Sequence, residues 1–213
     1  MSPPSITRLC LIRHGETLWN AERRIQGQTD IELNAHGRRQ AHAAGRWLKD
    51  EGAAALYSSD LLRAWHTAQA VGTDCGLQPQ LAPELRERRY GLFESLTYDE
   101  AKARHPDEYA RFEAREPAFA FSGDGESLED IHARVVARLQ DIASAHAGQT
   151  VLVVTHGGVL DIVNRFVRGV SLSTPRDFVI PNAGLNWISV HAGMWQLDDW
   201  AVTAHLDEAL DEL

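Results

Sequence analysis

Short apolar runs alternate with longer amphipathic segments along most of this chain. Three of the runs have the length and apolar character of buried strands: 8–13, 55–58 and 150–155. The segments between them repeat apolar residues every three or four positions, as helices with one buried face do. Two further runs, 185–191 and 194–202, are typical of a hairpin. The pattern predicts an α/β protein in which helices cover a sheet.

Helix boundaries are marked by residues that cap N-termini. Such a residue accepts hydrogen bonds from the first free amides of a helix, so its position predicts where the helix begins. The candidates are Asn34 for a helix that runs to about Glu51 and stops at Gly52, Ser59-Asp60 for a helix with Arg63 in its first turn, and Ser127-x-x-Asp130 for a helix closed by Gly148.

Residues 79–125 depart from the regular pattern, because their charge density is higher and their apolar spacing is less even. Within them, Thr97–Glu113 is helical in period, with a break near Pro106. We expect this stretch to be an insertion that covers the sheet. No repeat, linker or low-complexity segment divides the chain, so residues 1–213 are predicted to form a single domain.

Composition and charge narrow the function classes. The formal net charge of −9 over 213 residues argues against nucleic-acid binding, which needs a basic surface. No apolar run approaches the roughly 20 residues that cross a membrane. The two cysteines, Cys10 and Cys75, are too few for a disulfide framework or a four-cysteine zinc site, so we expect reduced thiols in the cytoplasm. A homodimer is left as one option.

Two predicted strands each end in a histidine followed by glycine. Arg13-His14-Gly15 follows the first strand, and His156-Gly157-Gly158 follows the strand at 150–155. Ligands of open α/β sheets gather at the carboxyl ends of strands, so both histidines are expected in one pocket. Metal sites of this kind usually need three or four ligands, and neither a His-x-x-x-His nor a His-x-Asp grouping accompanies the two histidines, which disfavours a metal site. Arginine, histidine and glycine amides at helix N-termini favour phosphate instead.

These residues belong to four ordered motifs, which are RHGETLWNAERRIQGQTDIELNAHGRRQA, SSDLLRAWHTA, PELRERRYGLFE and VVTHGG. In these motifs the chain resembles the histidine phosphatase superfamily, which contains cofactor-dependent phosphoglycerate mutases and fructose-2,6-bisphosphatase. The resemblance extends along nearly the whole chain. It implies a three-layer α/β/α sandwich with a mostly parallel central sheet.

Carried over residue by residue, the resemblance implies a role for each site position. His14 matches the nucleophile that becomes phosphohistidine, and Glu87 matches the proton donor. Neighbouring arginines should keep His14 neutral and able to attack phosphorus. The simpler alternative for Glu87 is a surface acid paired with Arg86 and Arg88. The positions implied for phosphate or substrate binding are Arg13, Arg63, His156, Asn20, Gln26 and Gly157.

The chemistry is expected to be hydrolysis of small phosphomonoesters, without a metal or other cofactor. The mutases of this family are generally longer after the acid motif, and the short stretch 91–125 favours a phosphatase. A phosphoglycerate mutase stays the alternative, and a module that only binds phosphorylated ligands is a third, less favoured class. Arg23, Arg88 and Arg111 are candidates for a second anionic group of the substrate, with a solvated surface as the simpler interpretation.

Overall fold

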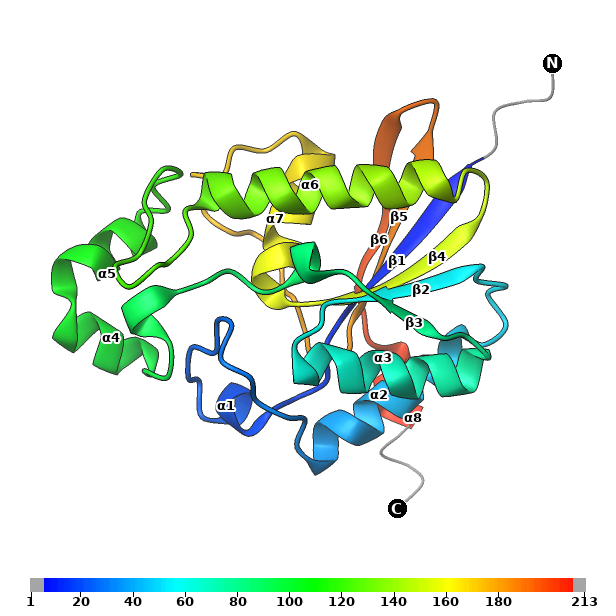
Figure 1. Cartoon of the computed structure of the whole chain (residues 1–213), viewed down its shortest axis with the longest axis horizontal. Helices are drawn as coiled ribbons and strands as arrows, with labels where there is room; N and C mark the ends of the chain where they lie inside the picture. Colours follow the sequence, from blue (N-terminus) through cyan, green and yellow to red (C-terminus); the bar gives the residue numbers. More distant parts are fainter. Residues whose placement is uncertain (1–5, 209–213) are drawn as a thin grey trace.

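A six-stranded mixed sheet forms the centre of the computed structural model, which describes residues 6–208 (Figure 1). The strand order is β3-β2-β4-β1-β5-β6. The first four strands of this order are mutually parallel, whereas β5 is antiparallel to both β1 and β6. The strands are β1 (Thr7–Arg13), β2 (Ala55–Ser58), β3 (Pro79–Leu81), β4 (Thr150–Thr155), β5 (Leu185–His191) and β6 (Met194–Val202).

Helices cover both faces of the sheet, which confirms the predicted three-layer α/β/α fold. In Figure 1, α6 and α7 lie over one face, while α2, α3 and α8 lie over the other. The helices are α1 (Leu18–Ala21), α2 (Ala35–Leu48), α3 (Leu62–Cys75), α4 (Tyr98–Arg104), α5 (Pro106–Glu113), α6 (Leu128–Ala145), α7 (Gly157–Arg168) and α8 (Ala204–Glu208), with single 3-10 turns at Pro83–Leu85 and Gly91–Phe93.

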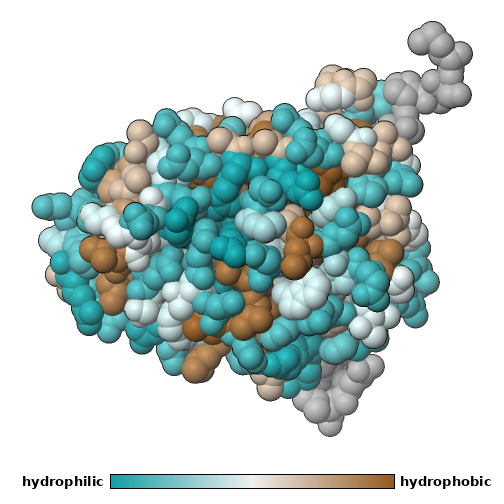
Figure 2. Space-filling view, in the orientation of Figure 1, coloured by the Kyte–Doolittle hydropathy of each residue, from teal (hydrophilic) through white to brown (hydrophobic). Residues whose placement is uncertain are grey.

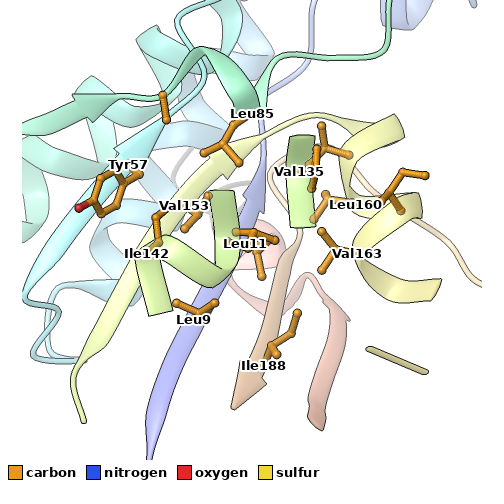
Figure 3. Packing of buried hydrophobic residues seen from close by; sticks show 14 of the residues in the cluster. Leu9, Leu11, Tyr57, Leu85, Val135, Ile142, Val153, Leu160, Val163 and Ile188 are labelled. Carbon is orange, nitrogen blue, oxygen red and sulfur yellow. The ribbon is translucent and has the colours of Figure 1, made fainter. Parts of the chain in front are cut away.

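The central strand β1 is buried on both faces, and its alternate residues belong to different cores. Leu9 and Leu11 pack with residues of α6 and α7. Figure 3 shows these two side chains among Val153 of β4, Ile142 of α6 and Leu160 of α7. Cys10 and Ile12 point the other way and pack against α2 and α3. The continuous apolar run of β1 therefore follows from its place in the middle of the sheet.

Residues between β3 and α6 form the cover, which lies at one end of the molecule beside the loop that carries α1 (Figure 1). The cover has an aromatic core of its own, in which Phe93, Phe119 and Phe121 are buried. It begins later than expected. Pro79–Leu81, assigned to the cover from its irregular pattern, instead pairs with β2 as the edge strand β3.

Most predicted helix boundaries are confirmed. Asn34 caps α2 and Ser127 caps α6 with the predicted capping box. The break before Pro106 separates α4 from α5. The prediction that Ser59 and Asp60 cap α3 is wrong, because the helix starts one residue later. Leu61 stands at the N-cap position and makes no side-chain bond to α3. The carboxylate of Asp30, from a distant loop, accepts the Leu62 amide at 2.7 Å instead.

On the face shown in Figure 2, hydrophilic residues predominate and hydrophobic residues form scattered patches. No helix within residues 6–208 is long and apolar enough to span a membrane.

Gly15 marks the point where the end of β1 meets α2 and α3. Its amide donates to Thr67 Oγ1 of α3 at 3.0 Å. A Cβ atom on Gly15 would lie 2.3 Å from the carbonyl oxygen of Gly37 in α2, closer than real contacts allow. Because both neighbours are held by helices, only glycine fits at this position. The position of the preceding His14 depends on this close approach.

We therefore expect Gly15→Ala to destabilise the fold by about 1–3 kcal/mol, the usual effect of overpacking a buried position. Urea unfolding followed by circular dichroism measures the loss. Gly193→Ala is the comparison, since an added Cβ there meets nothing within 4 Å and has only the cost of a positive φ. Equal unfolding midpoints for Gly15→Ala and the parent protein would contradict this account of the packing.

Candidate active site

The two histidines predicted to share a pocket lie next to each other at the carboxyl edge of the sheet. The parallel strands β1 and β4 end together, because Arg13 pairs with Thr155. The residue that follows each strand is a histidine. The His14 amide donates to the Thr155 carbonyl at 2.9 Å. The imidazole centroids of His14 and His156 are 5.2 Å apart. Strand pairing therefore brings the two histidines to the same edge of the sheet.

His14 is buried, and its surroundings favour a neutral ring with one free nitrogen. Its Nδ1 lies 2.7 Å from the carbonyl oxygen of Gly15, an acceptor, so Nδ1 holds the proton and Nε2 keeps its lone pair. Burial lowers the pKa of His14 well below 6.5, and the charges of Arg63 and Arg13 lower it further. The sequence argument named the two arginines, and the structure adds burial as the larger cause.

Arg63 and Arg13 each have part of the guanidinium bound by the protein and part left over. Arg63 is fully buried and donates to the carbonyl oxygens of Gly27 at 2.6 Å and Thr29 at 3.0 Å. Burial lowers its pKa to about 10. Arg13 donates from Nη1 to the carbonyl of Ile180. The Nε atoms of both arginines are buried without a hydrogen-bond partner in the described chain.

His156 has a third unpartnered nitrogen. Its Nε2 lies 2.8 Å from Ser59 Oγ. That hydroxyl accepts the Leu61 amide, so its own proton is available to donate to Nε2, which puts the proton of neutral His156 on Nδ1. Nδ1 is buried and has no partner among the described residues. Buried N–H donors rarely stay unpaired, so these three nitrogens together are suited to bind an oxyanion.

Glu87 faces this group of donors. Its Oε2 accepts the Gly158 amide at 3.0 Å, and its Oε1 accepts the Arg88 amide at 2.8 Å. The alternative of a surface acid paired with its neighbours does not fit. Arg86 forms its ion pair with Asp60 at 2.6 Å, and the Glu87 side chain is buried. Each carboxyl oxygen keeps a second lone pair, so Glu87 is able to hold and transfer a proton.

Asn20 and Gln26 line a pocket of about 80 Å³ together with Arg13, His14, Arg63 and Glu87. The amide oxygen of Gln26 accepts from Thr17 Oγ1 at 2.9 Å. The amide oxygen of Asn20 accepts from the Thr17 amide at 3.1 Å and from Asn182 Nδ2 at 3.3 Å. Since protein donors occupy both oxygens, the NH₂ groups are left to donate to an anion.

Of the remaining predicted residues, Gly157 and Arg88 lie at the site, whereas Arg111 and Arg23 do not. Gly157 is the first residue of α7, and a Cβ there would lie 3.6 Å from Arg13 Nε, so this glycine lies beside the arginine. Arg88 lines a larger cavity beside this pocket, which is described below. Its guanidinium donates to the carbonyls of Phe119 and Glu126, so it holds the cover in place. Arg111 pairs with Glu116 at 2.7 Å, and neither it nor the exposed Arg23 lines a described pocket that contains Arg13.

Glu94 is a positioning residue that sequence reasoning missed. Its two oxygens accept from the amides of Gln28, Thr29 and Tyr90 and from Thr29 Oγ1, at 2.8–3.1 Å. The carbonyls that hold Arg63 belong to the same loop, so Glu94 couples the cover to the arginine. Its place in the motif PELRERRYGLFE was the available signal. Asn182, which also donates to the His14 carbonyl, lies in a segment without periodicity and had no such signal.

A second cavity of about 450 Å³ adjoins the small pocket and shares Arg13 and Glu87 with it. Its walls include Tyr98 of α4, Tyr109 of α5, Gly157 and Asp161 of α7, and Arg176. A volume of this size is usual for small-molecule sites. No group of three or more His, Cys, Asp or Glu within residues 6–208 is arranged to hold a metal ion.

Comparison with known proteins agrees with this geometry. Residues 9–203 match the sequence model of the histidine phosphatase superfamily (branch 1). The chain is 38% identical over 203 residues to phosphoglycerate mutase-like protein 4 of Arabidopsis thaliana, covering 94% of this chain and 87% of that protein. It is 37% identical to a metal-independent phosphoserine phosphatase of the same plant, covering 94% and 84% of the two chains.

Solved structures give the same result. A mycobacterial glucosyl-3-phosphoglycerate phosphatase superposes with a TM-score of 0.83 at 32% sequence identity. The alignment covers 93% of this chain and all of that one. The likeness therefore includes the cover as well as the sheet.

The lowered pKa values of His14 and His156 make the stability of the fold depend on pH. Below pH 6.5 the unfolded chain takes up protons at both positions while the folded chain does not, so acid favours unfolding. We expect the free energy of unfolding to fall between pH 6.5 and 5, each histidine contributing up to about 1.4 kcal/mol per pH unit. Urea titrations at several pH values measure this slope.

Carboxylates also contribute to the slope, so single variants are needed to isolate the histidines. His14→Gln and His156→Gln should each make the fall with acid shallower. His42→Gln, at an exposed position of α2, should leave it as in the parent protein. The same slope in all four proteins would contradict burial of two neutral imidazoles.

Proposed function

Because the chain belongs to the histidine phosphatase superfamily, we propose that it hydrolyses small phosphomonoesters, without a metal ion, through a phosphohistidine formed on His14. The observation that carries the proposal is a neutral imidazole beside His156 and in one pocket with Arg13 and Arg63, three residues that each have a buried nitrogen without a partner within residues 6–208. We also propose a cytoplasmic location, in which the free thiols of Cys10 and Cys75 stay reduced.

In the first step, His14 Nε2 attacks phosphorus and the bond from phosphorus to the ester oxygen breaks. Protonated Glu87 gives its proton to that oxygen, and an alcohol leaves. The ring gains positive charge as the nitrogen–phosphorus bond forms, and the Gly15 carbonyl at Nδ1 stabilises that charge. The products of this step are an alcohol, phosphohistidine and the Glu87 carboxylate.

In the second step, water attacks the phosphorus of phosphohistidine. The Glu87 carboxylate takes a proton from the water, the nitrogen–phosphorus bond breaks, and inorganic phosphate leaves. His14 Nε2 recovers its lone pair, and Glu87 is again protonated. One carboxyl group therefore acts as an acid in the first step and as a base in the second.

The arginines supply the electrostatic part of the mechanism. Phosphoryl transfer spreads negative charge over the equatorial oxygens, and catalysis depends mainly on positioning and on stabilising that charge. We assign this role to Arg13, Arg63 and His156, with the amides of Asn20 and Gln26 orienting the group. The side chains of Arg13, Arg63 and His156 are already held through their other nitrogens by carbonyl and hydroxyl partners, so little reorganisation accompanies the reaction.

Phosphoglycerate mutase is the second candidate, and the Arabidopsis relative named mutase-like is the observation that favours it. Both activities share the first step and differ in whether water or a second substrate oxygen receives the phosphoryl group. Phosphatases stand among both the sequence relatives and the structural neighbours, and they support hydrolysis.

The nucleophile is tested by trapping the intermediate with a ³²P-labelled phosphomonoester in the presence of a chelator. We expect acid-labile, alkali-stable label on the parent protein, and neither label nor phosphate release from His14→Ala. His42→Ala is the matched control and should be labelled like the parent. Label or release within tenfold of the parent in His14→Ala would overturn the phosphohistidine mechanism, and ligand binding without any turnover by the parent would favour a binding module.

Glu87→Gln tests the proton donor. A positioned general acid contributes about 10²–10⁴ in rate, so hydrolysis of alkyl phosphates should slow by that factor. The loss should be smaller for p-nitrophenyl phosphate, because its leaving group needs little protonation. Equal losses for both substrates would assign Glu87 to water activation or structure. The same assays with 3-phosphoglycerate and 2,3-bisphosphoglycerate should show little isomerisation, and efficient isomerisation would favour the mutase.

A further inference from the structure

The support segment, residues 179–184, leads into β5 and holds the main chain of His14. The Ala183 amide donates to the carbonyl oxygens of Arg13 at 3.0 Å and His14 at 3.3 Å. Asn182 Nδ2 donates to the same His14 carbonyl at 3.1 Å. The end of β1, where His14 follows the strand, is therefore fixed by the chain that enters β5.

The support segment also contacts two of the side chains assigned to phosphate binding. The Ile180 carbonyl accepts from Arg13 Nη1. Asn182 Nδ2 donates to the amide oxygen of Asn20 at 3.3 Å as well. One short segment is therefore bonded to three members of the site, which are His14, Arg13 and Asn20.

Ala183 has a backbone conformation that alanine does not favour. Its φ of 54° lies in the left-handed region, which residues with a Cβ atom rarely adopt. Such a conformation persists only where the surrounding structure holds it. The end of β1 holds the amide of Ala183, so its carbonyl is the second point at which this residue can be fixed.

His205 of α8 supplies that second point. Its Nε2 lies 3.0 Å from the Ala183 carbonyl oxygen, which can only accept, so Nε2 is the donor. His205 is buried, and its ring centroid lies 6.1 Å from that of Trp47 in α2. His205 is also outside residues 9–203, the stretch on which membership of the superfamily rests.

We propose that His205 is a positioning residue for phosphoryl transfer. By holding Ala183 it fixes the support segment, and thereby the place of His14 Nε2 relative to a bound phosphoryl group. The proposal rests on the proposed phosphatase function. Attack on phosphorus needs accurate alignment, and a misplacement of about 1 Å can slow a reaction about 100-fold. A bond that only stabilised the fold would leave this rate unchanged.

The test measures how fast His14 is labelled in a single turnover of ³²P-labelled p-nitrophenyl phosphate, at a temperature where the proteins compared are folded. His205→Leu removes the donor, and we expect labelling at saturating substrate to slow by about tenfold or more. An alkyl phosphate should show the same factor, because the misplaced group is His14 and not Glu87. The substrate concentration that gives half of the maximal rate should change less than the rate itself.

Two amide side chains provide the matched comparison. His205→Gln can place an N–H group near the position of Nε2, whereas His205→Asn is one methylene shorter and does not reach the Ala183 carbonyl. We expect His205→Gln to recover most of the parental labelling rate and His205→Asn to label as slowly as His205→Leu. This comparison decides the question even where His205→Leu does not fold.

His146→Leu is the control for stability. His146 bonds to Tyr57 Oη and to Gln149 Oε1, both at 3.0 Å. It precedes the first residue of β4, whereas the site lies beyond the last, so it is at the opposite edge of the sheet. We expect His146→Leu to lower the unfolding midpoint in urea and to keep the parental labelling rate.

The outcomes separate this proposal from the proposed function. A parental labelling rate in His205→Asn, or equal rates in His205→Asn and His205→Gln, would overturn the positioning role. Slowing in His146→Leu as large as in the His205 variants would also overturn it, since the rate would then follow stability. Absence of labelled His14 in the parent protein with both substrates would instead overturn the proposed function on which the assignment rests.

Discussion

The active site depends on two guanidinium groups that main-chain carbonyls hold in the protein interior. Arg63 is bound by Gly27 and Thr29, and Arg13 by Ile180. A carboxylate bonded directly to either group would neutralise it, whereas carbonyl oxygens orient the group and leave its charge in place. That charge, together with burial, keeps His14 neutral, and it is available to stabilise a phosphoryl group.

Much of the surrounding structure serves to hold those carbonyls and the acid opposite them. Glu94, from the cover, binds the amides of the loop that supports Arg63. On the other side, Arg134 donates to the carbonyls of Glu84, Arg86 and Glu87 and pairs with Glu126, which fixes the segment that carries the acid. The cover has a hydrophobic core of its own, separate from the two cores that pack against the sheet. Catalytic geometry and cover stability are therefore linked.

Helix α7 connects the two histidines to the arginines of the larger cavity. Its N-cap is His156, its first two residues approach Arg13 and Glu87, and one turn later Asp161 pairs with Arg115 and Arg176, which line that cavity. The helix therefore sets the spacing between these two groups of side chains.

The sequence by itself determined what depends on local physical chemistry. Apolar runs, capping residues and the break at Pro106 predicted most elements, and motif spacing brought His14 and His156 to one edge of the sheet, because neighbouring parallel strands end together. The tertiary structure decided which distant groups meet. It made Pro79–Leu81 an edge strand, capped α3 with Asp30, tied Arg88 to the cover, and placed Arg176 at the cavity. Such partners lie far apart in the chain, and no local pattern records a contact that only folding creates.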